Sequence, residues 1–247
     1  MEKLPLSIGI LAWHSGQTLI DTLYSYYKNN LLNLSNDITI FFQEITDEDK
    51  KIANHFQIPF IGNEKNIGIG KAFLALSKNA QTENILLLEH DWFLIENPNI
   101  TQHRLTSGIN LLNQGFNVIK YRHRLNPGFP LFTYNAYKDK ELNHLDSEIQ
   151  LFSPHLLESI HWLDPAEKFP DKIQKQGEYY VTNSRWGNWT NNPCLFKTKF
   201  YTETVTPFAG DKIDLEGKIS YWWARQDFKV AHGEGLFTHK DIKKYGK

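Results

Sequence analysis

Hydrophobic and polar positions follow two different periods at the start of the chain. Residues 4–13 alternate with a period of two, which predicts a strand with one buried face. A helix capped by Ser15 is expected next, because apolar residues recur at the three-to-four spacing of one helical face: Leu19, Leu23, Tyr26, Tyr27 and Leu31. A strand is therefore followed at once by an amphipathic helix.

The same succession of strand and helix continues to about residue 121. Further strands are expected over four stretches: 37–43, 57–61, 84–88 and 116–121. The helices between them start at the acidic residues 47–49 and near Gly68, and the last one ends at Gly115. The stretch 84–88 is apolar throughout, which is typical of a central parallel strand that is covered on both faces.

The second half of the chain loses this rhythm. Residues 122–140 have the composition of a loop, and two later helices are expected, one starting at Ser153 and one over residues 211–226. Alternating strands and helices favour a mostly parallel sheet that is flanked by helices. We therefore expect an α/β protein with a single domain over 1–247, in which 1–121 form a Rossmann-like nucleotide-binding half and 122–247 a less regular half.

Composition and charge exclude several function classes. Lys plus Arg number 27 and Asp plus Glu 28, so the net charge of -1 gives no broad attraction to nucleic acid or to an anionic membrane. The chain has one cysteine, no apolar run long enough to span a membrane and no stretch typical of a signal peptide. A cytoplasmic protein is therefore expected. The aromatic share of 14%, with seven tryptophans, needs an explanation of its own.

Two carboxylates stand where the apolar run of the central strand ends. Glu89 and Asp91 flank His90, and ligands bind beyond the carboxyl ends of the strands in an open parallel sheet. Carboxylate oxygens at such an edge can hold a hard divalent cation, which in turn binds a diphosphate. The alternative is that the same triplet is only a solvated strand end or a helix cap.

Two other motifs are weaker than they look. Residues 68–71 suggest a phosphate-binding loop, but the Walker pattern requires glycine where this chain has Lys65, and serine or threonine where it has Ala72. A zinc site is not indicated, because the chain has no second thiol and no HExxH motif.

The order of these motifs resembles the family 2 glycosyltransferases with the GT-A fold. The resemblance is carried by the strand and helix start at 6–19, by 66–68 before a helix, by the acidic strand end, and by 191–197 and 215–230 in the second half. It implies a GT-A fold with an acceptor-side second half. It also implies a metal-dependent, inverting and non-processive transferase that moves a sugar from a nucleotide sugar, with a UDP-sugar favoured, to a glycan or glycoconjugate acceptor.

The resemblance also implies roles for individual residues. Glu216 aligns with the acid that deprotonates the acceptor hydroxyl, and Asp91 and His239 with ligands of Mn²⁺ or Mg²⁺. The residues expected around the donor are Ala12, Trp13, His14, Glu44, Asn66, Lys71, Glu89 and His90. This chain departs from the family at two of these places, since His14 replaces a usual asparagine and residues 43–46 replace an acid-acid-glycine-serine run.

Four of the seven tryptophans lie in the second half of the chain as two close pairs with different surroundings. Trp186 and Trp189 lie in a polar, glycine-containing stretch, and tryptophan rings stack well on the C–H faces of sugars, which favours an acceptor cleft. Interior packing is the alternative for both. Trp222 and Trp223 fall in the middle of an expected helix and are expected to be structural.

Two other function classes fit part of the pattern. A sugar-phosphate nucleotidyltransferase shares the Rossmann-like start and the metal, but it usually opens with a glycine-rich loop that residues 12–16 lack. A non-catalytic carbohydrate-binding protein on a transferase scaffold fits the departures at His14, Gln43 and Gly217. A glycosyltransferase releases a nucleoside diphosphate, and a nucleotidyltransferase releases pyrophosphate. A carbohydrate-binding protein binds a sugar without turnover.

Overall fold

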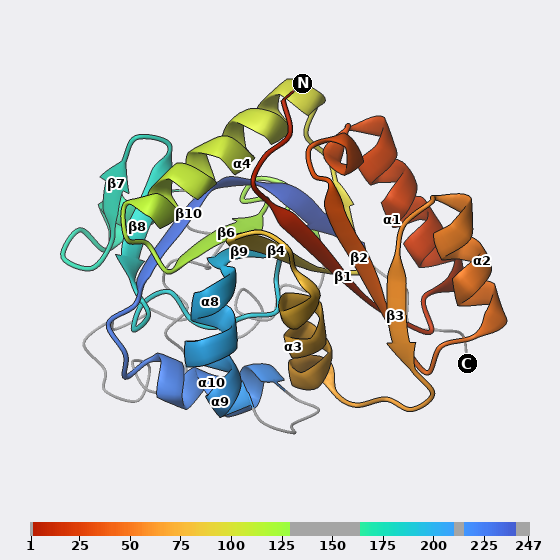
Figure 1. Ribbon diagram of the computed structural model, residues 1–247. Helices are drawn as coiled ribbons and strands as arrows, with labels where there is room; N and C mark the ends of the chain where they lie inside the picture. The colour runs from red at the N-terminus through yellow and green to blue at the C-terminus, as the bar shows by residue number, and fades with distance from the viewer. Residues whose placement is uncertain (1, 129–163, 210–214, 241–247) are drawn as a thin grey trace, which may run out of the picture.

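One mixed β-sheet forms the centre of the protein (Figure 1). The computed structural model describes residues 2–128, 164–209 and 215–240. The strand order is β3-β2-β1-β4-β9-β6-β10-β8-β7, with β5 paired to β10. The strands are β1 Ser7–Trp13, β2 Asp37–Gln43, β3 Phe60–Asn63, β4 Asn84–Glu89, β5 Trp92–Leu94, β6 Val118–Arg122, β7 Gln174–Gln176, β8 Tyr179–Asn183, β9 Cys194–Lys197 and β10 Lys229–His239.

Helices cover both faces of this sheet (Figure 1). They are α1 Gly16–Lys28, α2 Asp47–His55, α3 Ile69–Asn79, α4 Pro98–Asn113, α7 Pro165–Lys168, α8 Thr198–Phe200, α9 Thr206–Ala209 and α10 Leu215–Trp223, with a 3₁₀ turn η1 at Leu31–Asn33 and a π-helical turn η2 at Tyr201–Val205. The expected fold class, an α/β sheet flanked by helices, is confirmed.

Six strands of the sheet run in one direction. β1 pairs in parallel with β2 and β4, β2 with β3, and β6 with β10. β9 lies antiparallel between β4 and β6, so β6 and β10 run in the same direction as β4. The carboxyl ends of all six strands therefore meet at one edge, which is where an open α/β sheet binds its ligands.

Alternate residues of β4 pack into opposite layers. Leu86 and Leu88 face the core under α1, α2 and α4, whereas Ile85 and Leu87 face the core under α3 and α10. Burial of such a side chain stabilises the fold by about 1.5–3 kcal/mol. The expectation of a central strand covered on both faces is confirmed.

The strand expected at 57–61 was placed too early. β3 starts at Phe60, because the preceding residues complete the end of α2. Gln57 adopts a left-handed backbone with φ 56, its N–H donates to Asn54, and the Ile58 N–H donates to Ala53. These two bonds form a Schellman motif, which terminates a helix and usually has glycine where Gln57 stands.

Two details of α1 also differ from expectation. Ser15 precedes the helix, but its hydroxyl makes no capping hydrogen bond, so the expected cap was wrong. Tyr26 is buried as expected, whereas Tyr27 is 68% exposed. Neighbouring residues are about 100° apart around a helix, so one face does not bury both tyrosines.

The second half adds the antiparallel strands that the chain pattern left open. Of the expected helices, the one starting at Ser153 lies outside the described residues, and the later one is described from Leu215 to Trp223. Trp223 is buried and Trp222 stacks on Phe208 with ring centroids 4.1 Å apart, so both are structural as expected.

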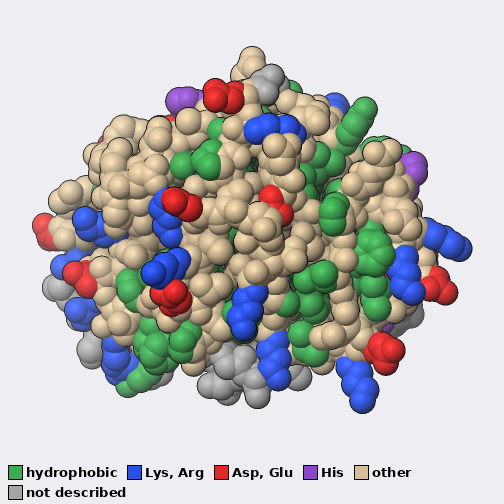
Figure 2. Space-filling view, viewed as in Figure 1, with side chains coloured by type: hydrophobic (Ala, Val, Ile, Leu, Met, Phe, Trp, Pro, Cys, Tyr) green, Lys and Arg blue, Asp and Glu red, His purple; other side chains and the backbone are tan. Residues whose placement is uncertain are grey.

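The surface agrees with the near-neutral charge of the chain. Figure 2 shows lysine, arginine and acidic side chains interspersed over the face it presents, with hydrophobic side chains reaching the surface between them. Within the described residues, no helix combines the length and the apolar composition needed to cross a membrane.

Candidate functional site

The carboxyl ends of β1 and β2 bring Trp13, His14 and Glu44 together. Trp13 pairs with Gln43 in the sheet register, so the residues that follow these two strands are neighbours. The Trp13 indole N–H donates to Glu44 Oε2 over 2.7 Å, and His14 Nε2 lies 2.9 Å from the same oxygen. The hydrogen bond from Trp13, with a smaller contribution from His14, lowers the pKa of Glu44, which is therefore an anion at neutral pH.

This cluster has the features of a ligand contact. His14 and Glu44 have left-handed backbones with φ values of 45 and 51, and such strain tends to occur at functional sites. Trp13 remains 48% exposed although it is a large apolar side chain. An exposed aromatic face beside a carboxylate can stack on a planar base and accept its N–H groups. Ala12 is fully buried beneath the cluster and supports it from the core.

Gln43, which was not among the expected site residues, holds the loop before α3. Its buried carboxamide accepts a hydrogen bond from Ile67 N over 2.8 Å. Asn66 Oδ1 accepts from Gly68 N over 2.8 Å and fixes the next turn. Gln43, where the chain departs from the family pattern, therefore stabilises the loop before α3. An amide at the end of a buried strand is the feature of the sequence that could have predicted this role. Lys71 is exposed in the first turn of α3.

The ends of β4 and β10 bring Asp91 and His239 together. β5 pairs antiparallel with the last residues of β10, so His239 lies opposite Trp92. His239 Nε2 is 3.3 Å from Asp91 Oδ2, and its ring packs edge-on against Trp92 with centroids 4.7 Å apart. The Lys240 N–H donates to the Asp91 carbonyl over 2.9 Å. Residues that are far apart in the sequence are thus held together at the edge where the parallel strands end.

This pair fits a divalent cation. Asp91 Oδ1 and His239 Nδ1 are buried and have no hydrogen-bond partner in the described part of the chain. Adjacent ligands of an octahedral ion with 2.0–2.1 Å bonds lie about 3 Å apart. Asp91 Oδ2 and His239 Nε2 are 3.3 Å apart and share a hydrogen bond, so both would bind one ion only after the proton between them is lost. Burial raises the pKa of Asp91, but the hydrogen bond from His239 and the charges of His90 and His239 outweigh burial and lower the pKa below its usual value. Asp91 is therefore available as a carboxylate ligand.

Glu89 and Glu216 complete the acidic edge. Burial, and then the charges of Asp91 and Glu216, raise the pKa of Glu89 well above its usual range. Glu216 therefore lies within electrostatic reach of the β4 end, although the two residues are far apart in the sequence. Glu216 is exposed in the first turn of α10, and its Oε1 accepts a hydrogen bond from Asn191 N over 2.7 Å. This bond aims the carboxylate while leaving it accessible to a ligand.

His90 anchors the acidic strand end to the rest of the fold. Thr22 Oγ1 on α1 donates to the His90 carbonyl over 2.6 Å. Burial of the imidazole lowers the pKa of His90, which favours the neutral ring.

Trp186 and Trp189 lie in the interior. They are 7% and 4% exposed. Trp189 stacks on Phe196 with centroids 5.7 Å apart and meets Trp223 edge-on at 5.2 Å. This is the packing alternative that the sequence left open, and an acceptor contact by either ring stays a prediction.

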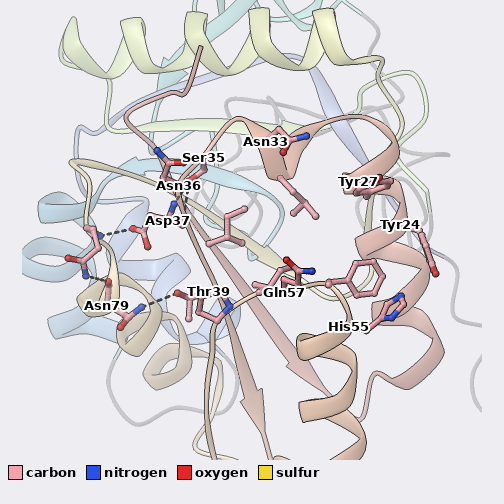
Figure 3. Close-up of a pocket in the computed structure, with 16 residues that line it drawn as sticks. Tyr24, Tyr27, Asn33, Ser35, Asn36, Asp37, Thr39, His55, Gln57 and Asn79 are labelled. Carbon is pink, nitrogen blue, oxygen red and sulfur yellow. Dashed lines mark hydrogen bonds between the residues drawn. The ribbon is translucent and has the colours of Figure 1, made fainter. Parts of the chain in front are cut away.

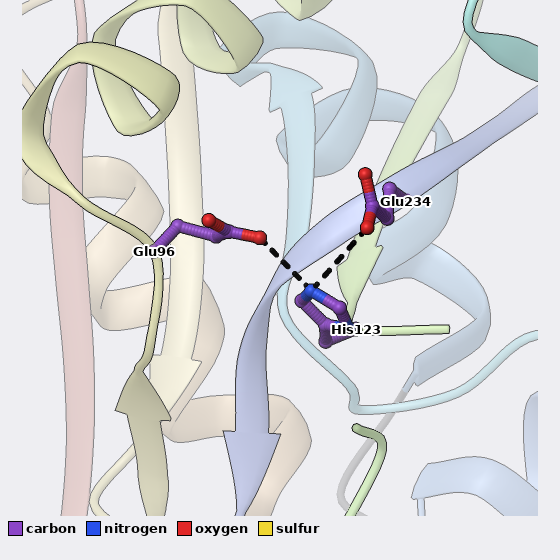
Figure 4. Close-up of side chains that lie close together, drawn as sticks. All are labelled: Glu96, His123 and Glu234. Atoms are coloured by element: carbon purple, nitrogen blue, oxygen red, sulfur yellow. Dashed lines mark hydrogen bonds and ion pairs between the residues drawn. The ribbon is translucent and has the colours of Figure 1, made fainter. Parts of the chain in front are cut away.

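A second group of potential ligands surrounds His123 (Figure 4). Glu96, His123 and Glu234 each offer one ligand atom, and these atoms lie within 4.8 Å of one another. His123 Nδ1 accepts hydrogen bonds from Leu125 N and Asn126 N, at 3.2 and 3.0 Å. A neutral imidazole that accepts at Nδ1 carries its proton on Nε2.

The position of the proton on His123 Nε2 determines whether this group can bind a metal. Nε2 lies 2.9 Å from Glu96 Oε1 and 4.0 Å from Glu234 Oε1, so it donates to Glu96 and has no lone pair for a metal. The buried Arg104 also bridges both glutamates. The group is therefore a hydrogen-bonded ion cluster that ties α4 to β10. Asp91 with His239 offers more to a metal, because Asp91 Oδ1 and His239 Nδ1 have no hydrogen-bond partner in the described part of the chain, whereas both ring nitrogens of His123 are engaged.

Comparison with known proteins identifies the fold. No family model matches the chain, and no curated protein matches it. S. aureus TarS in complex with UDP-GlcNAc superposes with a TM-score of 0.57 at 15% identity, covering 99% of this chain and 60% of that one. Mannosyltransferase PcManGT from Pyrobaculum calidifontis, in complex with GDP-Man and Mn²⁺, superposes with a TM-score of 0.58 at 8% identity, covering 99% of this chain and 59% of that one.

A third similar structure is glucosyl-3-phosphoglycerate synthase from Mycobacterium tuberculosis, in complex with Mn²⁺, UDP and phosphoglyceric acid. It has a TM-score of 0.51 at 12% identity, covering 95% of this chain and 71% of that one. The chain thus spans about 60% of the length of the TarS fragment 1-349 and of PcManGT, and 37% of a longer TarS chain. Similarity at these identities defines the architecture, and the chain has the GT-A fold.

Proposed function

We propose that the protein is a metal-dependent glycosyltransferase that transfers one sugar at a time from a nucleotide sugar to an acceptor hydroxyl. The observation that carries the proposal is the meeting of Asp91 with His239, beside Glu89 and within reach of Glu216. The fold, which is shared with structures crystallised with UDP-GlcNAc or with GDP-Man and Mn²⁺, supports it. A UDP-sugar is the favoured donor, and a glycan or glycoconjugate is the acceptor.

The proposal divides the edge of the sheet into two parts. The ring of Trp13 stacks on the base of the donor, and Glu44 accepts an N–H group from it. Glu89, whose raised pKa favours the protonated form, donates a hydrogen bond to the ribose. Asp91 and His239 hold Mn²⁺ or Mg²⁺, which when bound neutralises the negative charge of the diphosphate.

Glu216 supplies the general base of the proposed reaction. Its carboxylate takes the proton of the acceptor hydroxyl, and the acceptor oxygen forms a bond to the anomeric carbon. The bond between that carbon and the β-phosphate oxygen breaks on the opposite side, so the nucleoside diphosphate leaves and the configuration inverts. The hydrogen bond from Asn191 N orients Glu216 for this step, and a positioned base typically contributes 10²–10⁴-fold in rate.

The compartment belongs to the proposal as well. Cys194 is the one cysteine of the sequence and is buried, so the chain has no disulfide within itself, which suits a reducing environment. We therefore propose that the protein acts in the cytoplasm.

A donor screen tests the proposed activity. UDP-, GDP- and dTDP-sugars are incubated with the protein, Mn²⁺ and a mixture of glycan acceptors, and the released nucleoside diphosphate is measured. Glu216→Gln is expected to lower kcat by 100-fold or more because the amide accepts no proton. Asp91→Ala is expected to abolish the dependence of the rate on Mn²⁺. Full turnover in either variant contradicts the role assigned to that residue.

The same assay includes a matched control variant and distinguishes a second candidate function. Glu203→Gln makes the same change at an exposed glutamate of η2 that pairs with Lys199, and it is expected to leave turnover unchanged. Release of pyrophosphate in place of a nucleoside diphosphate indicates a nucleotidyltransferase.

A further inference from the structure

A cavity lies beside the amino end of β2 (Figure 3). The proposed active site is at the other end of the sheet, where the parallel strands have their carboxyl ends. It has a volume of about 720 Å³ and is formed by α1, the end of α2, the start of β2 and the residues after α3. Ligand pockets typically enclose about 300–1,000 Å³. β2 has seven residues, and a strand rises about 3.3 Å per residue, so the cavity and Glu44 are separated by roughly 20 Å.

One wall of the cavity is aromatic. Tyr24 and Tyr27 lie one helical turn apart on α1 and are 51% and 68% exposed. The Tyr24 ring packs edge-on against Phe56 with centroids 5.1 Å apart, so it is held in place while its surface stays accessible. Exposed, braced aromatic rings offer apolar faces to a ligand at a low cost in conformational entropy.

The remaining lining of the cavity mixes aliphatic residues, namely Leu32, Ile38, Ile58 and Pro59, with neutral amides. Side-chain amides line it at Asn33, Asn36, Gln57, Asn79 and Gln81. Each amide has two donor hydrogens and two acceptor lone pairs. Asn33 and Asn79 each donate one side-chain hydrogen bond within the protein, so both have further hydrogen-bonding capacity for a ligand. Figure 3 shows Asn33, Asn79 and Gln57 placed around the hollow, from three different elements.

The charges around the cavity do not favour an anionic ligand. Among the described residues that line it there is no lysine or arginine, and His55 is the one basic side chain. The one lining carboxylate, Asp37, accepts hydrogen bonds from the Ser7 hydroxyl and from Gln81 N, the latter over 2.7 Å. A phosphate or a nucleic acid would meet a carboxylate and only one histidine here, whereas aromatic faces beside neutral amides suit a ligand with alternating C–H faces and hydroxyls.

Gln57 is the most informative residue of the cavity. It occupies the left-handed position of the Schellman motif after α2, whereas the equivalent position after α4 is Gly115. A left-handed backbone costs a non-glycine residue about 1–2 kcal/mol. The chain thus carries an exposed amide at a position where glycine would be more stable, and this amide faces the cavity.

We propose that this cavity binds an uncharged glycan chain. Binding in the cavity requires neither a nucleotide nor a metal, and the inference is therefore independent of the proposed transferase activity.

Titration of the full chain with neutral oligosaccharides tests this inference. Maltohexaose, cellohexaose, chitohexaose and mannohexaose are added in the absence of nucleotide and metal, and binding is followed by calorimetry. At least one of them is expected to bind. Tyr27→Ala is expected to weaken that binding about 5- to 10-fold, as expected for loss of an aromatic contact, whereas Tyr27→Phe keeps the ring and stays within 2-fold.

Gln57→Gly separates lost binding from lost folding. Glycine fits the left-handed backbone, so the thermal midpoint is expected to stay the same or rise while the affinity for the oligosaccharide falls at least 3-fold. Glu216→Gln is expected to bind the oligosaccharide like the wild type, which keeps this outcome distinct from failure of the proposed activity. Absence of binding by all four oligosaccharides, or binding that neither Tyr27→Ala nor Gln57→Gly weakens, overturns the inference. Displacement of the bound oligosaccharide by an unstructured peptide would identify a peptide groove instead.

Discussion

His232 on β10 is a base held neutral inside the sheet. Its side chain is buried, and its Nε2 lies 2.7 Å from the Arg122 carbonyl oxygen, so Nε2 carries the proton and donates. Burial lowers the pKa of His232 well below its usual value, and the charges of Arg124, Lys120 and Arg122 act in the same direction. Protonation of this ring therefore favours the unfolded chain.

The stability of the protein should fall between pH 7 and pH 5.5 for this reason. An unfolded histidine binds a proton below about pH 6.5, whereas folded His232 does so only at a lower pH. The unfolded state thus binds more protons in this window, and the free energy of unfolding decreases as the pH falls. Urea unfolding at pH 7.5 and 5.5 should show a smaller decrease for His232→Gln, which keeps a donor toward Arg122. An equal decrease in both proteins contradicts this role.

At the scale of single residues, the sequence predicted contacts better than exposure. Glu44, Asp91 and His239 were expected at strand ends, and the structure places them at the edge where the carboxyl ends of the parallel strands meet, while their roles toward a ligand stay predictions. The exposure of Tyr27 and the burial of Trp189 differ from what their neighbours suggested, because side-chain direction depends on one helical or strand position that a composition pattern does not resolve.

At the scale of elements, the loop after β6 positions the end of β10. Gly128 forms a bridge with His239, and the His239 N–H donates to the Pro127 carbonyl over 3.2 Å. The backbone of Gly128 has φ 69, and a Cβ atom there would lie 1.9 Å from the His239 carbonyl oxygen. The loop can approach this closely only with glycine.

Gly128→Ala should therefore displace His239. We expect the affinity for Mn²⁺ to fall at least 10-fold, as measured by calorimetry. Gly177→Ala is the matched control, because Gly177 also has a positive φ of 59 but nothing lies within 4 Å of its Cβ position. The control should lose about 1 kcal/mol of stability and keep its Mn²⁺ affinity. Equal affinities in Gly128→Ala and the wild type would show that the bridge does not position His239.

The pattern of the chain predicted local elements but not all of their partners. β1, β2 and β4 were expected within a few residues of their observed bounds, because each is an apolar segment whose signal is contained in its own residues. The place of β9 between β4 and β6, and the pairing of β5 with β10, depend on segments that are distant in sequence. No local periodicity carries that information.

At the scale of the whole molecule, Arg104 connects three parts of the fold. It lies on α4, pairs with Glu96 after β5 over 2.9 Å, and also pairs with Glu234 and the Gly235 carbonyl in β10. Without Arg104, Glu96 keeps the hydrogen bond from His123 and Glu234 reaches solvent, so the loss is that of hydrogen bonds to charged groups, about 1.5–3 kcal/mol each.

Arg104→Met should destabilise the protein by about 2–3 kcal/mol in urea unfolding. Lys50→Met removes a cation from the exposed pair with Asp47 on α2 and should cost less than about 1 kcal/mol. Similar losses in both variants would mean that the ion cluster around Arg104 contributes no more than a surface pair.

A crystal structure grown with UDP and Mn²⁺ tests the central claim most directly. We predict one Mn²⁺ ion bound by Asp91 and His239, the diphosphate on that ion, and the uracil against Trp13 and Glu44, with the Glu216 carboxylate facing the open side of the diphosphate. A metal bound by Glu96, His123 and Glu234, or a nucleotide bound away from the carboxyl ends of β1, β2 and β4, would contradict the account.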